Sequence, residues 1–391
     1  MRLRKAGLEL RFMGYAALAG ALGVAACVSV ASPRGGTGNV PVVRGQYKNG
    51  RDQIVRIALA TAAHEGADLG SGRGPLVIRP DANSQFVVWG GKRYRGSLVI
   101  TATDSGLLVV NQLPMDDYLR GVVPLEIGNR TAAEFAAVQA QAVAARTYAY
   151  KHLTDARAFD MYSTVQDQVY GGVDAEKPQA DTAIMTTGDV VVLYNGQPIT
   201  TPYHSTCGGS TAAVSEVWYD QSDQPYLRPI SDRIPGTDHF YCDPSPRFSW
   251  TQSFDGPGLR AVMEKYLAAY TKAPKAGAGR ITDIREQGRT PSGRIAALSV
   301  QTDSGTYTLR GNDIRFVLRD PKGTILNSTF FSFTRETSGG EVSTLTVNGR
   351  GYGHGIGMCQ WGAIGRARAG QNYRTILETY YPGTTVGRIG S

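Results

Sequence analysis

Four glycines occupy every second position from 351 to 357, within the sequence RGYGHGIGMCQWGA that begins at Arg350. Glycine at this density weakens helices and strands, so the segment predicts positive φ angles or a close approach of the backbone to a ligand. A flexible linker is the alternative. Linkers are rich in Gly and Ser, however, whereas these glycines lie among His354, Gln360 and Trp361. The pattern therefore favours a binding site.

The N-terminus predicts export. A basic start precedes an apolar run over residues 12–26, which is short for a membrane span and fits a secretory signal. Small residues come directly before Cys27, as in a bacterial lipoprotein cleavage and acylation site. We therefore expect a signal peptide over 1–26, a lipid on Cys27, a tether over 27–50 and a membrane-anchored lipoprotein at the cell envelope. Ordinary cleavage, with Cys27 lost or free, is the alternative.

The charge of the chain argues against nucleic-acid binding. The formal net charge is +8, and removing the four basic residues and Glu9 of the signal segment leaves +5. This surplus is modest and unclustered, so an acidic wall polymer is a better partner than a nucleic acid. The length allows two or more domains, and the Gly and Tyr content is typical of a loop-rich, largely β fold.

Hydrophobic periodicity predicts an α+β fold that is mostly β. Short strand-like runs (IVRIALA, PLVIRP, SQFVVW, GSLVITA and GLLVVN) indicate a small β subdomain over 51–110. Thr131 and Glu134 form a capping box that opens an Ala-rich helix through about Leu153. A larger domain over 111–387 would contain this helix, a mixed α/β insert at about 247–340, and two short C-terminal helices.

Two polar side chains near the Ala-rich helix are functional candidates. Glu126 stands among apolar residues in a segment that Pro124 makes irregular, and apolar surroundings raise a carboxyl pKa toward that of a general acid. Its alternative role is a helix-entry glutamate that binds backbone donors. Arg146 either clamps a polar substrate or pairs with a carboxylate.

The cysteines form a second constellation. His204 with Cys207, and His239 with Cys242, are two His-x-x-Cys pairs whose four ligands match a closed, structural zinc site. A Cys207–Cys242 disulfide and two free thiols are the alternatives. Cys359 is expected to be a small buried residue rather than a nucleophile.

Several segments of the chain resemble the SpoIID/LytB family, which comprises stage II sporulation protein D and the amidase enhancers. The matching segments are YLRGVVPLEI, FAAVQAQAVAARTYAY, DQVYGG, YHSTCGG, PYLRP, SGRI, the VW at 217–218 and RGYGHGIGMCQWGAIGRARAGQNYRTILETYYPGT. They cover the chain from about Leu107 to Thr384 in family order.

This resemblance implies a SpoIID-like fold and a peptidoglycan lytic transglycosylase that cleaves glycan strands stripped of stem peptides. The catalytic glutamate of the family falls on Glu126. Zinc, which some members bind, falls on the His/Cys pairs, where it would hold the YHSTCGG loop and place Tyr203 and Ser205 against the substrate. Tyr170, His354 and Gln360, together with Tyr203 and Arg146, would bind the sugars.

A lytic transglycosylase needs one carboxyl group. Glu126 would protonate the leaving oxygen and then deprotonate the C6 hydroxyl of muramic acid, giving a 1,6-anhydro end. A noncatalytic glycan-binding module that recruits or stimulates an amidase, and a structural envelope lipoprotein, are the alternative functions.

Overall fold

The computed structural model describes residues 48, 52–61, 75–81, 84–103 and 106–389. The expected signal peptide, Cys27 and most of the tether lie outside these residues. Within them the fold is α+β, as the sequence predicts. No helix among the described residues combines the length and apolar character needed to cross a bilayer.

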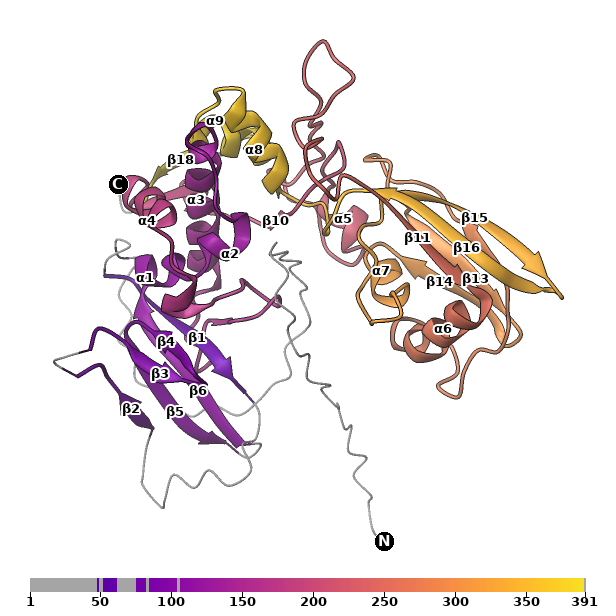
Figure 1. Ribbon diagram of the computed structural model, residues 1–391, viewed down its shortest axis with the longest axis horizontal. Helices are drawn as coiled ribbons and strands as arrows, with labels where there is room; N and C mark the ends of the chain where they lie inside the picture. The colour runs from indigo at the N-terminus through magenta and orange to yellow at the C-terminus, as the bar shows by residue number, and fades with distance from the viewer. Residues whose placement is uncertain (1–47, 49–51, 62–74, 82–83, 104–105, 390–391) are drawn as a thin grey trace, which may run out of the picture.

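An N-terminal sheet forms one end of the molecule (Figure 1). Its strand order is β2-β5-β6-β1-β7, antiparallel except for the parallel β1–β7 pair. The strands are β1 (Ile54–Ala60), β2 (Leu76–Ile78), β5 (Ser97–Thr103), β6 (Gly106–Pro114) and β7 (Met161–Tyr162), beside the hairpin β3 (Val87–Trp89) and β4 (Lys92–Tyr94). Each strand-like run of the sequence overlaps one of these strands.

A helical layer packs on this sheet and shares its hydrophobic core. It comprises α1 (Met115–Arg120), α2 (Val123–Ile127), η1 (Ala132–Glu134), α3 (Phe135–His152), η2 (Gly172–Ala175) and α4 (Pro178–Thr186). The predicted capping box of Thr131 and Glu134 is present at the start of η1, and α3 follows directly. Nearly every residue of α3 from Ala137 to Tyr150 is buried, because its many alanines let neighbours approach on all sides.

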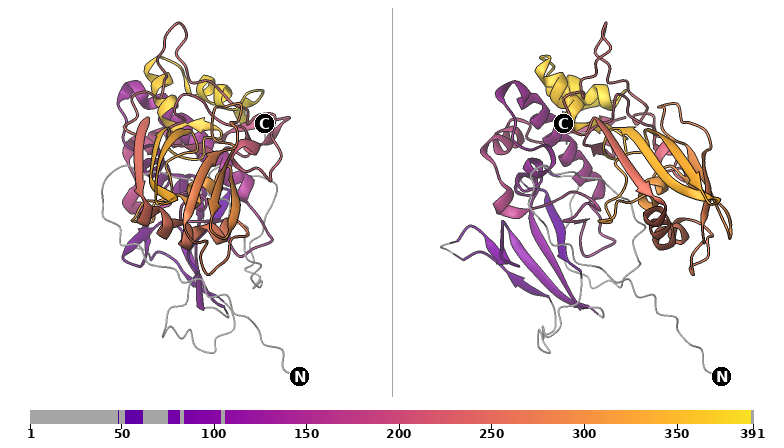
Figure 2. Two further views of the ribbon diagram at one scale, coloured as in Figure 1. Left: turned by 90° about the vertical axis from the view of Figure 1, so that its right-hand side faces the viewer. Right: turned by 45° about the vertical axis from the view of Figure 1, so that its right-hand side comes forward.

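The insert forms a second body with its own core, drawn in red to orange in Figures 1 and 2. Two three-stranded antiparallel sheets, ordered β11-β16-β15 and β12-β13-β14, pack with two helices. The elements are β11 (Ser249–Asp255), α6 (Gly256–Tyr270), β12 (Ile281–Glu286), β13 (Ala297–Thr302), β14 (Gly305–Arg310), α7 (Asp313–Val317), β15 (Phe331–Ser338) and β16 (Glu341–Arg350).

The C-terminal segment returns to the first body (Figure 2). Strand β17 (Met358–Cys359) pairs in parallel with β10 (Tyr203–His204), and α8 (Gln360–Arg368) and α9 (Tyr373–Tyr380) pack against α3. The two short C-terminal helices predicted from the sequence are therefore present. The remaining elements are β8 (Val190–Tyr194), β9 (Gln197–Pro198), α5 (Val214–Val217) and β18 (Thr385–Arg388).

Candidate functional site

Glu126 lies in the short helix α2, not in a loop, because Pro124 occupies the first turn, where a missing N–H costs nothing. Its side chain is 3 % exposed. The backbone N–H of Val169 donates to Oε1 at 3.4 Å and the Gln360 amide donates to Oε2 at 3.5 Å. Burial raises the pKa of the Glu126 carboxyl to about 7, although these donors and the Tyr203 hydroxyl oppose the shift. Glu126 is thus a proton donor near neutral pH.

Further buried hydrogen bonds orient the two side chains that donate to the Glu126 carboxyl group, Tyr203 and Gln360. The Gln168 amide donates to the Tyr203 hydroxyl at 2.9 Å, and the Gln360 amide also contacts Oε1 of Gln141 at 3.3 Å. Tyr203 and Gln360 were expected to bind sugar. The structure places both against the carboxyl group, where they oppose the rise of its pKa, and Gln360 also lines the cavity that Glu126 faces.

Glu126 faces a cavity of about 530 Å³. The lining residues come from α2 and the turn after it, from the start of α8 and from two loops; they are Pro124–Arg130, Val169, Ser205, Pro246, Arg247, Gln360, Trp361 and Ile364. Ser205, which the sequence analysis expects to face the substrate, lines this cavity. Among these described lining residues, Glu126 is the one carboxylate, whereas Arg130 and Arg247 are cations.

The structure does not bring Arg146 or Tyr170 to this cavity. Arg146 is fully buried, and its guanidinium donates to the carbonyl oxygens of Thr187 and Ile184 and contacts Asp116 at 3.4 Å. The Tyr170 hydroxyl donates to the Asn111 side chain at 2.8 Å. Arg146 therefore ties α3 to α1 and α4, whereas Tyr170 is tied to strand β6 of the N-terminal sheet. Of the two roles that the sequence analysis leaves open for Arg146, the structure shows the pairing with a carboxylate.

The four alternating glycines at 351–357 make close contacts within the protein, and none of them lines the cavity around Glu126. All four have positive φ, as expected. A Cβ on Gly353 would lie 2.7 Å from the His204 side chain, and one on Gly351 would lie 2.9 Å from the Thr206 carbonyl oxygen. His354 is buried and its Nε2 lies 3.0 Å from the Tyr203 carbonyl oxygen. The segment thus packs against residues 202–207, and His354 does not reach the cavity.

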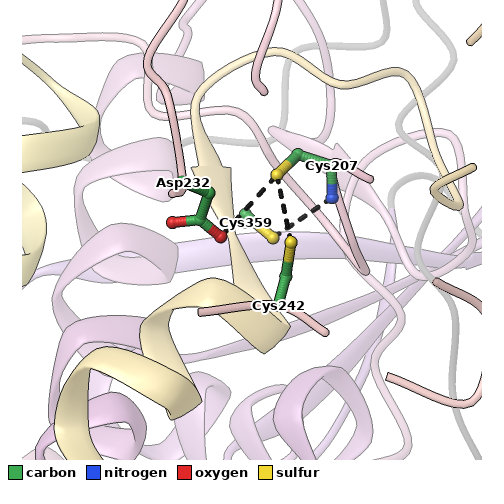
Figure 3. A group of neighbouring side chains, drawn as sticks. All are labelled: Cys207, Asp232, Cys242 and Cys359. Carbon is green, nitrogen blue, oxygen red and sulfur yellow. Dashed lines mark hydrogen bonds between the residues drawn. The ribbon is translucent and has the colours of Figure 1, made fainter. Parts of the chain in front are cut away.

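Apart from the Glu126 cavity, the structure contains a buried cluster of three cysteines and one aspartate (Figure 3). The ligand atoms of Cys207, Asp232, Cys242 and Cys359 all lie within 4.8 Å of one another. The Cys207 and Cys242 sulfurs are 3.5 Å apart, and Oδ2 of Asp232 is 3.7 Å from the Cys207 sulfur. Arg366 and Tyr380 bind Oδ1 of Asp232, which leaves Oδ2 facing the thiols.

This cluster corrects the predicted ligand set. Cys207 and Cys242 belong to it, but the two histidines do not. His239 has a side chain that is 79 % exposed and lies 3.0 Å from Asp243, while Nδ1 of His204 lies 3.1 Å from the Ile356 carbonyl oxygen. The prediction paired each histidine with the nearest cysteine in the sequence. The fold instead brings together residues that are distant in the chain.

Cys359 and Asp232 are the two members of the cluster that the sequence prediction missed. Cys359 caps α8, accepting the backbone N–H groups of Cys207 and Gly362, each at 3.2 Å. Although burial opposes it, hydrogen bonding from the two other thiols and from the Cys207 N–H lowers the pKa of the Cys359 thiol to about 5. Three sulfurs and one carboxylate oxygen in contact form a donor set that could hold a metal ion.

Comparison with known proteins matches both bodies of the molecule. The family model "Stage II sporulation protein" (SpoIID) matches residues 103–194, and a "Domain of unknown function" (DUF8618) matches 234–357. An uncharacterized protein of Brachyspira hyodysenteriae is 31% identical over 76% of this chain and 73% of its own length.

Two proteins of Bacillus subtilis are also similar. Stage II sporulation protein D is 30% identical over 71% of this chain and 75% of its own length. The amidase enhancer is 34% identical over 68% of this chain, which spans 40% of that longer protein.

Proposed function

Because the chain belongs to the SpoIID family, we propose that it cleaves peptidoglycan glycan strands by lytic transglycosylation, with Glu126 as the single acid and base. Family membership supports a cell-wall-related role, and the sporulation protein and the amidase enhancer are its named relatives. The reaction itself is inferred from the site. The observation that most supports this reaction is a single buried carboxyl group with a pKa near neutral pH. It faces a cavity whose described lining residues include no second acid.

A hydrolytic glycosidase normally needs two carboxyl groups, one for the leaving oxygen and one for water or a covalent bond. One group suffices when the sugar supplies its own nucleophile. Glu126 would give its proton to the glycosidic oxygen as the bond breaks. The resulting carboxylate would then take the proton of the muramic acid C6 hydroxyl as that oxygen bonds to the anomeric carbon. The products are a new chain end and a 1,6-anhydro end, and Glu126 regains its proton.

The experiment uses purified protein and glycan strands freed of stem peptides, with mass spectrometry of the products. Glu126→Gln should lower release of 1,6-anhydro ends by at least about 10²-fold, the scale of acid–base catalysis. Glu264→Gln, at an exposed position of α6, is the matched control and should retain activity. Ordinary reducing ends in place of anhydro ends, or full activity of Glu126→Gln, would refute the proposal.

The amidase enhancer supports a second candidate, a module that binds glycan and stimulates an amidase. The two functions separate in the Glu126→Gln protein. If amidase stimulation on isolated cell walls survives this substitution while the wild type releases no anhydro ends, the chain acts by binding.

We propose further that the cluster of Cys207, Asp232, Cys242 and Cys359 holds a structural zinc ion. Zinc with sulfur ligands is tetrahedral with a Zn–S distance of about 2.3 Å, which places ligand atoms roughly 4 Å apart. The atoms of the cluster already lie within 4.8 Å of one another. Four protein ligands leave no position for water, so the ion would stabilise the fold and take no part in the reaction. Its ligands would tie the 205–210 loop to the start of α8.

Cell-envelope anchoring through a lipid on Cys27 also remains a proposal, supported by the sequence of the N-terminal segment alone.

A further inference from the structure

A second cavity, of about 680 Å³, lies on the insert where β11, β15 and β16 meet. Polar side chains and aromatic rings share its lining, which consists of Ser249, Trp250, Thr251, Arg289, Phe330, Phe331, Ser332, Asn348, Gly349 and Arg350. None of these described lining residues is acidic. The cavity belongs to the domain of unknown function and shares no lining residue with the cavity around Glu126.

Trp250 provides a fixed aromatic surface in this cavity. It pairs with Gly349 across β11 and β16, and a Cβ on Gly349 would overlap the indole ring. The ring therefore lies flat against the strand at a position that only glycine permits. The indole N–H donates to the Gly351 carbonyl oxygen at 2.8 Å, so the orientation of the ring is set before any ligand arrives.

Arg350 provides an available positive charge. Its guanidinium lies 4.6 Å from the centre of the Phe330 ring, and no carboxylate among the described residues pairs with it. Arg289, by contrast, is paired with Glu286 at 2.7 Å. A planar guanidinium stacked on a ring keeps its edge free for bidentate binding of a carboxylate.

One short segment of the chain, residues 246–251, supplies lining residues to both cavities. Arg247 lines the Glu126 cavity, stacks 4.1 Å from the centre of the Tyr352 ring, and has a buried Nη1 with no hydrogen-bond partner. Ser249 already lines the second cavity. Two residues span at most about 7 Å, so the backbone of Arg247 lies within that distance of the lining of the second cavity. An arginine thus lines each cavity, Arg247 the first and Arg350 the second.

We propose that the second cavity binds the continuation of the glycan strand that Glu126 cleaves, and that Arg247 and Arg350 pair with carboxylates of that strand. The inference rests on the proposed function. A strand without stem peptides exposes the lactyl carboxylate of each muramic acid, which gives it regularly spaced negative charges. Its pyranose rings have apolar faces that fit the flat surface of Trp250, and its hydroxyl groups fit the Asn348, Thr251 and Ser332 side chains.

The test measures binding in the Glu126→Gln protein, so that the strands stay intact. Arg350→Ala and Trp250→Ala should each weaken binding of long, peptide-free strands about tenfold or more, the scale of a charge-assisted hydrogen bond. A tetrasaccharide, too short to occupy both cavities, should lose less than twofold. Arg285→Ala is the matched control, since Arg285 is an exposed arginine of the same domain that pairs with Asp283.

Two further measurements make the outcome decisive. Strands whose carboxylates are reduced to alcohols should bind wild-type and Arg350→Ala cavities equally. Ser332→Trp, at an exposed position on β15, should block the cavity without disturbing the core, so a loss of binding would not reflect misfolding. Unchanged affinity in Arg350→Ala, Trp250→Ala and Ser332→Trp would overturn the inference. Failure of Glu126→Gln to stop cleavage would overturn only the proposed function.

Discussion

Cys359 and Gln360 are neighbours in the chain that serve two different sites. The Cys359 sulfur faces Cys207 and Cys242, whereas the Gln360 amide reaches Glu126. The first residue of α8 and the residue before it therefore link the cysteine–aspartate cluster to the carboxyl group. A shift of this helix end would move both.

The pKa of Glu126 predicts how activity depends on pH. The group must be protonated to act as an acid, and its pKa is raised to about 7. The rate with glycan strands should therefore fall as pH rises through about 7. A rate that stays level from pH 6 to 9 would argue against Glu126 as the acid.

Glu126 should also make stability depend on pH. Its folded pKa of about 7 lies above the ordinary value of 4.5, so the folded state holds the proton more tightly. Its contribution is fully present below pH 4.5 and is lost as pH rises from 4.5 to 7, at a cost on the order of 3 kcal/mol. Glu126→Gln removes this cost. Urea unfolding should show the variant more stable than wild type at pH 8 and nearly equal at pH 4, and equal differences at both would contradict the prediction.

Tyr203→Phe should raise the pKa of Glu126 further. The Tyr203 hydroxyl stabilises the charged carboxylate, and losing a hydrogen bond of about 1 kcal/mol raises a pKa by roughly one unit. The alkaline limb of the pH–rate profile should move upward. Tyr150→Phe is the control, because the Tyr150 hydroxyl donates to the Lys48 carbonyl oxygen; a similar shift in both variants would exclude a specific effect.

Gly353→Ala should be strongly destabilising. The position has a φ of +117°, and a Cβ there would lie 2.7 Å from the His204 Cβ. Backbone strain and the close contact together should lower the free energy of unfolding by more than about 2 kcal/mol. Gly370→Ala, at a φ of +82° with open space around it, should cost only about 1 kcal/mol. Denaturant unfolding of the two variants checks this difference.

Protein purified without chelators should contain one zinc ion per chain. Cys359→Ala and Asp232→Asn should lose zinc and melt at lower temperature, whereas His239→Ala should keep it, because His239 is exposed and outside the cluster. Loss of zinc in His239→Ala would instead support the ligand set predicted from sequence spacing, which includes His239. A metal-free protein two protons lighter than its reduced form would indicate a disulfide within the cluster instead of a zinc ion.

Local signals predicted local structure well. The capping box at Thr131 and Glu134, and the strand-like runs before residue 111, act over a few residues and appear where expected. Glu126 could be singled out because a lone carboxyl group among apolar residues is itself a local pattern. The partners of the site could not be found in this way. Cys359 comes close to Cys207 through a parallel strand pair that no local spacing encodes. The glycine-rich sequence is the same whether its backbone approaches a ligand or residues 202–207, so the sequence could not distinguish the two.

Strand β17, which pairs with β10, leads directly into Gln360, and the late position of this residue in the chain determines when the site can form during synthesis. Gln360 lies 234 residues after Glu126 in the chain. A growing chain therefore carries the glutamate long before the helix end that orients it, and closing so long a loop is slow. Under the proposed function, cleavage competence would arise only after synthesis has passed α8 and this helix has packed beside Glu126, so a chain that stops before α8 would leave the wall intact.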